Sequence, residues 1–225
     1  LLDIVAKSFP KFRIRFTTSN PQDMDNEVLI TMKAHNNICN HIHLPVQSGS
    51  DKILKEMNRQ HTREEYLNLV TEIKTILPDC GISQDMITGF PNETEKDHLD
   101  TLSLMNLVKY DFGFMFKYSE RPGTLASRKL DDNIPEEIKQ RRLSEIIDLQ
   151  FKHSFENLSK YVNKKTVVLI EKESKKSKGF WAGRNEQNIM VVFPKEDFKT
   201  GEFVEVLVKE NTATTLKGLG LNRII

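Results

Sequence analysis

The 225-residue sequence is poor in cysteine and has no long hydrophobic run. Its two cysteines, Cys39 and Cys80, match neither a metal-binding nor a thioredoxin-type spacing, so we expect reduced thiols in or near the core. No apolar stretch approaches the roughly 18 residues of a membrane helix, and the first residues lack the features of a signal peptide. These absences argue against a disulfide scaffold, a membrane protein and a secreted protein, and they predict a cytoplasmic location.

The sequence also lacks an initiator methionine and has little net charge. It begins inside an apolar helical pattern, so we expect a fragment of a longer protein. The formal net charge of +1 is unevenly distributed. Residues 159–225 hold 13 basic and 8 acidic side chains, whereas residues 1–158 hold 20 and 24. The basic C-terminal third favours an anionic partner such as nucleic acid.

Residues 41–51 predict a strand, a polar turn and a helix N-terminus. Apolar residues alternate with polar or proline positions up to Val46, and Ser50 is placed to cap the next helix. In parallel α/β folds, ligands bind beyond the C-terminal ends of strands. His43, Gln47 and Ser48 are therefore candidate binding residues, unless they only satisfy hydrogen bonds of the turn.

Helical and strand patterns alternate through the first two thirds of the chain. This order predicts βαβ crossovers and a parallel sheet, hence an α/β fold. Four strands make either an incomplete barrel or a small open sheet, and the truncated N-terminus favours the barrel. The expected strands are 11–18, 41–46, 82–90 and 112–118, and the expected helices are 1–9, 24–34, 51–57, 62–77 and 94–108.

A long helix is expected from residue 135 to about 161, with its cations Lys139, Arg141, Arg142 and Lys152 on a solvated face. After residue 163 the apolar period becomes two. Strands at 166–170, 189–193 and 203–208, separated by glycine-containing turns, predict a small antiparallel β-barrel. We therefore expect two domains, residues 1–160 and residues 161–225.

The stretch 84–94 contains two further candidates. Asp85 lies inside an apolar strand, where a carboxylate is costly unless it is paired, so either a functional or a structural role is open. Gly89 permits a sharp turn or the close approach of a ligand to the backbone. His41 and His43 face the same side of their strand, but a histidine pair without a third ligand is weak support for a metal site.

Cationic side chains mark two other regions. Arg121 lies on a loop after an expected strand, where arginine suits bidentate contact with a carboxylate or phosphate. In the C-terminal part, lysines precede aromatic residues, a combination suited to phosphates and stacked bases, although lysine-rich hairpins can also be merely soluble. These residues are Lys172, Lys175, Lys176, Lys178, Phe180, Trp181 and Arg184.

Several ordered motifs resemble those of the MiaB-type tRNA methylthiotransferases of the radical-SAM superfamily. The resemblance covers essentially the whole chain, and the sequence of residues 43–50 is similar to the MiaB branch rather than the ribosomal-protein branch. Asn92 stands where a glycine is common in this loop. The matching runs are 13–21, 38–50, 57–59 with 62–66, 89–91 with 93–94, and 118–119 with 121–124, followed by 135–137 and 141–143.

The resemblance implies a partial (β/α)6 barrel followed by a TRAM domain, with an enzymatic function for the full-length protein. That enzyme would insert a methylthio group at C2 of N6-isopentenyl adenosine beside the tRNA anticodon. It would use S-adenosylmethionine (SAM) and two 4Fe–4S clusters. The family's cluster-binding cysteine motifs are absent here, so we expect no cluster ligand, no metal site and no catalysis by this chain alone.

The resemblance also implies site residues and partners. Arg59 and Arg121 would contact either the SAM carboxylate or tRNA. The implied partners are a tRNA anticodon stem-loop and a reducing system, with no membrane, and a monomer is expected. The implied RNA-binding residues are Arg121 and the basic C-terminal set, without Trp181. The implied cofactor-binding residues are Ser19, His43, Gln47, Ser48, Arg59, Asp85, Gly89, Phe116 and Tyr118.

Two alternatives remain open from the sequence. One is a sister methylthiotransferase that acts on threonylcarbamoyl adenosine, since the residues that would contact the N6 substituent are not identifiable. The other is a stand-alone RNA-binding protein with a degenerate barrel.

Overall fold

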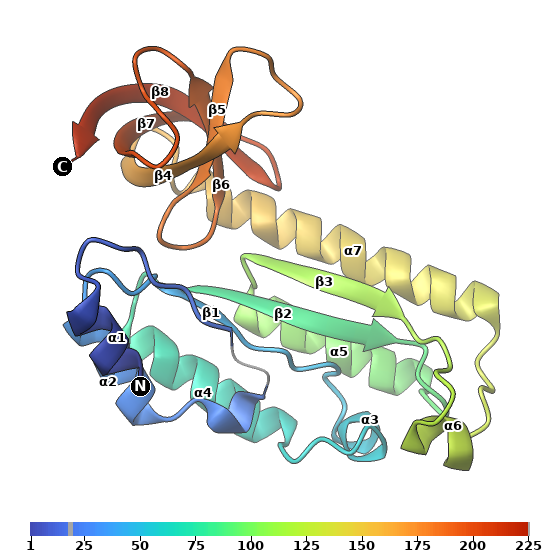
Figure 1. Cartoon of the computed structure of the whole chain (residues 1–225). Helices are drawn as coiled ribbons and strands as arrows, with labels where there is room; N and C mark the ends of the chain where they lie inside the picture. Colours follow the sequence, from blue (N-terminus) through green and yellow to red (C-terminus); the bar gives the residue numbers. More distant parts are fainter. Residues whose placement is uncertain (18–19, 225) are drawn as a thin grey trace.

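A computed structural model describes residues 1–17 and 20–224, which form a three-stranded parallel sheet with helices, and a closed β-barrel (Figure 1). The expected fold class is confirmed. The first part contains α1 (Leu2–Ser8), the 3-10 helix η1 (Pro21–Asp23), α2 (Asn26–Ala34), β1 (His41–His43), α3 (Asp51–Glu56), α4 (Arg63–Ile76), β2 (Gly81–Thr88), α5 (Glu95–Val108), β3 (Phe112–Lys117), α6 (Leu125–Lys129) and α7 (Glu136–Ser159).

The sheet has the order β1-β2-β3 with all strands parallel. Helices α4 and α5 lie against one face, and α7 runs beside β3 (Figure 1). Burial of large apolar side chains between the helices and the sheet supplies the main stabilisation of this part. Its fully buried members include Leu44, Ile73, Ile82, Leu104 and Tyr110.

The strand expected at residues 11–18 is wrong for the part that the structure describes. Only Ile14 forms a bridge, parallel to Ile38, through bonds from Ile14 N to Asn37 O and from Cys39 N to Ile14 O. The apolar residues of this segment nevertheless face inward, because Ile14 and Phe16 pack on the core. The side chains of Arg13 and Arg15 bind the β-barrel, and the segment does not continue strand pairing with its neighbour.

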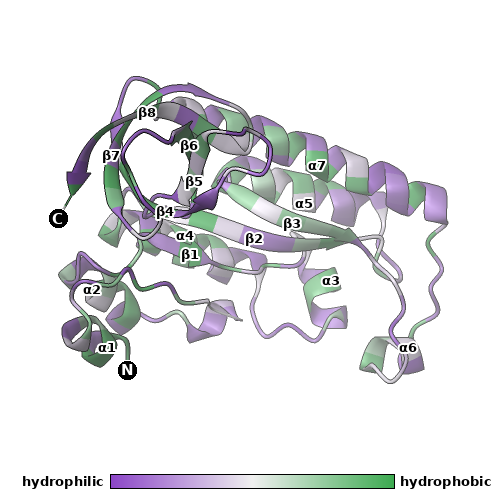
Figure 2. Ribbon diagram, turned by 45° about the horizontal axis from the view of Figure 1, so that its top comes forward, coloured by the Kyte–Doolittle hydropathy of each residue, from purple (hydrophilic) through white to green (hydrophobic). Residues whose placement is uncertain are grey.

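The β-barrel closes in the order β4-β5-β6-β8-β7. Neighbouring strands are antiparallel except β6 and β8, which are parallel. Hydrophobic and hydrophilic residues alternate along α7, which leads into the barrel (Figure 2). The sequence predicted three of these strands, which correspond to β4, β6 and β7, and it did not predict β5 and β8. The strands are β4 (Lys165–Glu173), β5 (Phe180–Arg184), β6 (Met190–Pro194), β7 (Phe203–Asn211) and β8 (Thr215–Ile224).

The helix starts expected from Ser50, Thr62 and Thr94 are confirmed by side-chain caps, and the last two form capping boxes. Asp97 connects two of these starts. It accepts hydrogen bonds from the Ser50 hydroxyl (2.6 Å) and from the Thr94 backbone N–H and hydroxyl (2.8 and 2.6 Å). One buried carboxylate thus holds α3 and α5 together.

No helix in the described part of the chain is long and apolar enough to cross a membrane.

We predict that Asp97→Asn lowers the free energy of unfolding by about 2 kcal/mol at pH 7, because charge-assisted hydrogen bonds are lost. Burial alone would raise the pKa of Asp97, but the bonds from Ser50 and Thr94 lower it to about 2. A carboxyl with a lowered pKa in the folded state stabilises the protein above its ordinary value of 3.8 and ceases to do so as pH falls toward 2.

Urea unfolding at pH 7 and at pH 3 measures both effects. Asp100→Asn on the same helix is the matched control, since the Asp100 side chain makes no hydrogen bond or ion pair among the described residues. Equal stability of Asp97→Asn and Asp100→Asn at pH 7 would contradict this role.

Candidate functional site

A cleft of about 340 Å³ lies beyond the C-terminal ends of the first two strands. Gln47 follows β1, and Ile87 and Phe90 lie at the end of β2. This is the edge of a parallel sheet where ligands commonly bind, and Gln47 lies there. The remaining lining residues are Glu56, Met57, Asn58, Arg59, Thr124, Leu125 and Ala126.

The backbone at Gln47 is bent into the cleft by an extra residue. His43 pairs with Ser83 and Gln47 pairs with Met86, so the first strand advances four positions while its neighbour advances three. Gln47 adopts a left-handed conformation with φ of 74°. Its N–H donates to Asp85 O (2.9 Å) and its carbonyl accepts from Ile87 N (3.0 Å). A left-handed non-glycine residue held by ladder hydrogen bonds is a feature that often marks binding sites.

A row of polar side chains extends along one face of the sheet toward this cleft. The Ser83 hydroxyl lies 3.0 Å from His41 Nε2 and 2.9 Å from His43 Nδ1. His43 Nε2 lies 3.4 Å from Asp85 Oδ1, and the Asp85 side chain is 30% exposed. Burial lowers the pKa of Arg59, and the nearby charge of Asp85 opposes this shift. Asp85 is therefore partnered by His43 and lies close to a cation that lines the cleft.

Ser48 and Gly89 serve the local fold. The Ser48 hydroxyl is fully buried, accepts from Ser50 N (3.2 Å) and lies 3.4 Å from Thr101 Oγ1. Gly89 has φ of 72°, and its N–H donates to Glu93 Oε2 (2.7 Å). A Cβ at Gly89 would lie 2.4 Å from Lys139 Cγ, so the close approach is to a side chain of α7.

Phe116 and Tyr118, two other residues implied for the cofactor, lie near the same strand ends. Phe116 pairs with Ile87 and is about half-exposed, at 54%. Tyr118 donates its backbone N–H to Thr88 O (2.8 Å), and its ring lies 5.0 Å from that of Phe90. Ser19 lies outside the described residues.

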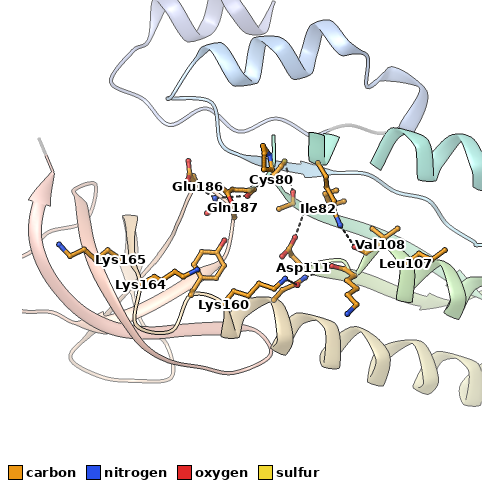
Figure 3. Close-up of a pocket in the computed structure, with 17 residues that line it drawn as sticks. Cys80, Ile82, Leu107, Val108, Asp111, Lys160, Lys164, Lys165, Glu186 and Gln187 are labelled. Atoms are coloured by element: carbon orange, nitrogen blue, oxygen red, sulfur yellow. Dashed lines mark hydrogen bonds between the residues drawn. The ribbon is translucent and has the colours of Figure 1, made fainter. Parts of the chain in front are cut away.

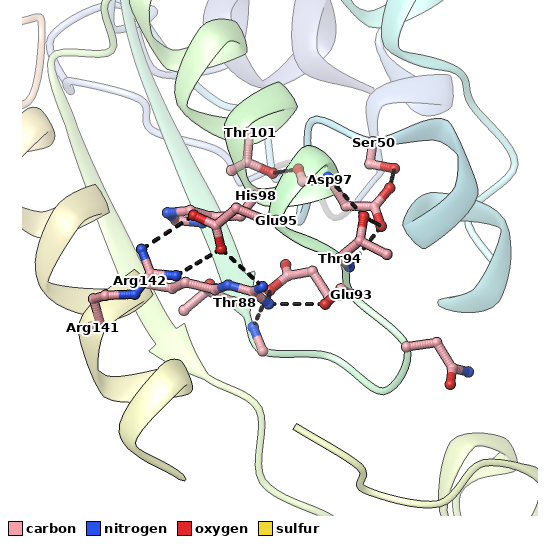
Figure 4. A network of polar contacts seen from close by, with 12 residues as sticks. Ser50, Thr88, Glu93, Thr94, Glu95, Asp97, His98, Thr101, Arg141 and Arg142 are labelled. Atoms are coloured by element: carbon pink, nitrogen blue, oxygen red, sulfur yellow. Dashed lines mark hydrogen bonds and ion pairs between the residues drawn. The ribbon is translucent and has the colours of Figure 1, made fainter. Parts of the chain in front are cut away.

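Helix α7 is tied to the turn after β2 by a buried ion pair (Figure 4). Arg142 Nη1 donates to Glu93 Oε2 (2.7 Å) and to Glu93 O (3.0 Å), and both side chains are at most 5% exposed. Lys139 is also buried and pairs with Asp132 at 2.5 Å. The expected solvated face is therefore wrong for Lys139 and Arg142, because the turn after β2 packs against that face.

The described residues do not fit an iron–sulfur cluster. Cys39 and Cys80 are buried, and burial raises the pKa of both thiols, to about 12 for Cys80. A cluster is held by several convergent thiolates, whereas these thiols stay protonated. No group of three or more His, Cys, Asp or Glu side chains suited to a metal occurs among residues 1–17 and 20–224.

A second cavity, of about 510 Å³, lies where the sheet meets the β-barrel (Figure 3). Gly81 and Asp111 line it, so it is at the N-terminal ends of β2 and β3, opposite to the cleft. Five lysines also line it, but most have protein partners: Lys74 donates to Val108 O (2.9 Å) and Lys160 to Asn157 Oδ1 (2.8 Å). This cavity differs from the cleft because it lies at the opposite strand ends and because most of its lysines are bonded to other groups of the protein.

Most of the C-terminal residues implied for RNA binding lie at one end of the β-barrel. Lys175, Lys176 and Lys178 are exposed on the connection between β4 and β5, next to Lys172 and Phe180. Arg184 is separate from them. It lies at the other end of β5, where its guanidinium donates to Asn188 O (2.9 Å). Arg121 is exposed in the loop before α6, three residues from Thr124 of the cleft.

Comparison with known proteins agrees with this geometry. Residues 1–105 match the Radical SAM superfamily, and residues 159–219 match the TRAM domain. The chain is 62% identical to the tRNA-2-methylthio-N(6)-dimethylallyladenosine synthase of Christiangramia forsetii and 53% identical to that of Bacteroides fragilis, in each case over 97% of the chain. Nearly the whole chain is therefore similar to the MiaB-type methylthiotransferases.

The chain spans less than half the length of these relatives, 45% of the first and 48% of the second. Among solved structures it is similar to coproporphyrinogen III oxidase from Escherichia coli, with a TM-score of 0.54 and 17% identity. That likeness covers 93% of this chain and 52% of the other, and it supports the radical-SAM type of fold.

Several cleft residues were missed from the sequence. Met57, Phe90, Leu125 and Ala126 line the cleft but carry no polar group or periodic pattern that would single them out. Helix α6, which supplies two of them, is only five residues long. Such residues can be recognised only from the tertiary structure, in which residues 56–59, 87–90 and 124–126 line one cleft.

We predict that Arg142→Met lowers the free energy of unfolding by about 3 kcal/mol, because Glu93 would remain buried without its cation. Chemical denaturation monitored by circular dichroism measures this loss.

The matched control is Arg141→Met at the adjacent, exposed position. Arg141 pairs with Glu95 and Glu145 at 2.7 Å, and exposed pairs of this kind contribute at most about 1 kcal/mol. Equal losses for the two variants would show that the buried pair has no special role.

Proposed function

We propose that this chain is part of a tRNA-2-methylthio-N(6)-dimethylallyladenosine synthase, an enzyme that adds a methylthio group at C2 of N6-isopentenyl adenosine in tRNA. The observation that supports this most strongly is the identity of 53–62% to proteins of that name along nearly the whole chain. The position of the cleft at the strand ends of a radical-SAM-type fold agrees with it.

We assign SAM to the cleft. When bound, SAM with an iron–sulfur cluster supplies the radical chemistry of this superfamily. Two 4Fe–4S clusters are expected in the full-length protein, with ligands outside this chain. The Gln47 amide and the Asp85 carboxylate suit hydroxyl or amino groups, and the Arg59 guanidinium suits the carboxylate of SAM. Apolar Ile87 and Phe90 offer a surface for the adenine ring.

The β-barrel is proposed to bind the tRNA anticodon stem-loop. Three exposed lysines on one loop can neutralise phosphates, and the neighbouring Phe180 offers a ring for a base. Arg121, on a loop near the cleft, is assigned to RNA rather than to SAM, because Thr124 lines the cleft whereas Arg121 does not.

The same proposal covers the organisation of the protein. We place the domain boundary at residues 160 and 161, between the end of α7 at Ser159 and the start of β4 at Lys165. A monomeric enzyme, supplied with electrons by a reducing system and acting in the cytoplasm where tRNA is found, is the simplest arrangement.

Mass spectrometry of tRNA nucleosides tests the proposed reaction. Cells that lack the full-length gene should lose 2-methylthio-N6-isopentenyl adenosine and accumulate its unthiolated precursor, and the intact gene should restore the product. Loss of the threonylcarbamoyl counterpart instead would place the protein in the sister branch. No change in either nucleoside would contradict the proposed reaction and favour a stand-alone RNA-binding protein.

We predict that Asp85→Asn in the full-length protein weakens SAM binding by about tenfold, since a hydrogen bond to a charged group contributes roughly 1.5–3 kcal/mol. Equilibrium dialysis with labelled SAM measures the affinity. Asp131→Asn is the control, because Asp131 is exposed and makes no ion pair among the described residues. Unchanged affinity in Asp85→Asn would remove Asp85 from the site.

A further inference from the structure

Two arginines that the proposed chemistry does not use contact the β-barrel from the segment between α1 and α2. Arg13 Nη1 donates to Arg184 O (2.5 Å) and Nη2 to Val167 O (3.3 Å). The Arg13 guanidinium also lies 4.9 Å from the centre of the Phe203 ring. Arg15 Nη2 donates to Asn185 O (2.7 Å). Arg13 therefore reaches three different strands, β4, β5 and β7, over more than 150 residues of sequence.

The segment that carries these arginines is itself fixed to the sheet. Ile14 is hydrogen-bonded on both sides, to Asn37 O (2.7 Å) and from Cys39 N (2.8 Å), and Ile14 and Phe16 pack on the core. With the apolar residues directed inward, Arg13 and Arg15 are directed outward to the β-barrel. Figure 1 shows this blue segment below the barrel.

Arg15 contacts the turn of residues 185–188, here called the junction turn, and Arg13 contacts Arg184 directly before it. Asn185 and Gln187 are buried, and Asn185 Oδ1 accepts from Ile189 N (2.9 Å), which fixes the shape of the turn. On its other side Gln187 Nε2 donates to Asp79 O (3.4 Å). Gly81 leaves room for it, because a Cβ there would lie 3.1 Å from Gln187 O.

We propose that Arg13 and Arg15 are positioning residues that hold the β-barrel in one orientation on the parallel sheet. Helix α7 alone leaves the barrel attached at one point, and a single attachment permits rotation. A second point is supplied by the junction turn, which lies between Arg15 and residues 79–81, and by the contacts of Arg13 with the neighbouring strands. The consequence for catalysis rests on the proposed function: RNA held by the barrel lysines must arrive at the cleft in a fixed geometry, and small misplacements slow a reaction strongly.

The charge of arginine alone does not explain the contact. Its acceptors are backbone carbonyls of different strands, so the planar guanidinium, which offers several N–H donors and stacks on a ring, fits where an ammonium does not. Arg13→Lys should therefore behave like Arg13→Ala, although lysine keeps the charge and much of the length.

Single-molecule fluorescence energy transfer in the full-length protein tests the orientation. Azidophenylalanine in place of Glu64 on α4 and of Thr200 between β6 and β7 gives two exposed labelling positions that avoid cysteine chemistry. We expect one narrow distance distribution for the wild type and for Lys11→Ala, an exposed residue of the same segment. We expect a broadened or shifted distribution for Arg13→Lys and for Arg13→Ala combined with Arg15→Ala.

Two additional measurements separate positioning from folding and from function. Far-ultraviolet circular dichroism should be unchanged in the arginine variants, and kcat for a stem-loop substrate should fall by about tenfold or more, while RNA affinity stays near that of the wild type. An unchanged distance distribution, or full turnover with a broadened one, would overturn the proposal. If the wild type shows no methylthiolation, the proposed function fails, whereas a broadened distribution in the variants would still support the contact.

Discussion

The buried ion pair between Arg142 and Glu93 is the interaction on which the cleft depends. Arg142 comes from α7 and Glu93 from the turn after β2, and the same carboxylate accepts the N–H of Gly89. A buried carboxylate is costly unless it is paired and hydrogen-bonded, so the turn keeps its shape only while α7 is in place. Since α7 also leads into the β-barrel, the strand ends and the barrel share one rigid element.

This arrangement divides the polar residues of the strand ends into two groups. Ser48, Gly89 and Asp97 are occupied by hydrogen bonds within the protein, and they shape the turns. Gln47 and Arg59 line the cleft, with Asp85 close to Arg59. The first group shapes the turns around the cleft. The second is the group that we propose to bind SAM.

Much of the fold could be predicted because its signals are local. The caps at Ser50, Thr62 and Thr94 and the period-two apolar pattern of β7 identify elements without knowledge of the tertiary structure. The failures depend on contacts between distant residues. Arg142 was expected on a solvated face, yet it pairs with Glu93. Arg13 and Arg15, in the segment expected as a strand, donate to carbonyls of the β-barrel that tertiary folding brings to them. Strands β5 and β8 contain glycines, which weaken the strand signal but let neighbouring strands approach closely.

The most direct test of this account is a crystal structure of the full-length protein with SAM bound. We predict that the cofactor lies beyond the C-terminal ends of β1 and β2, with its adenosine against residues 87–90 and its polar groups near Gln47, Arg59 and Asp85. SAM bound elsewhere, for example in the cavity between the sheet and the β-barrel, would contradict the assignment of the cleft. So would a structure in which the turn after β2 has left Arg142.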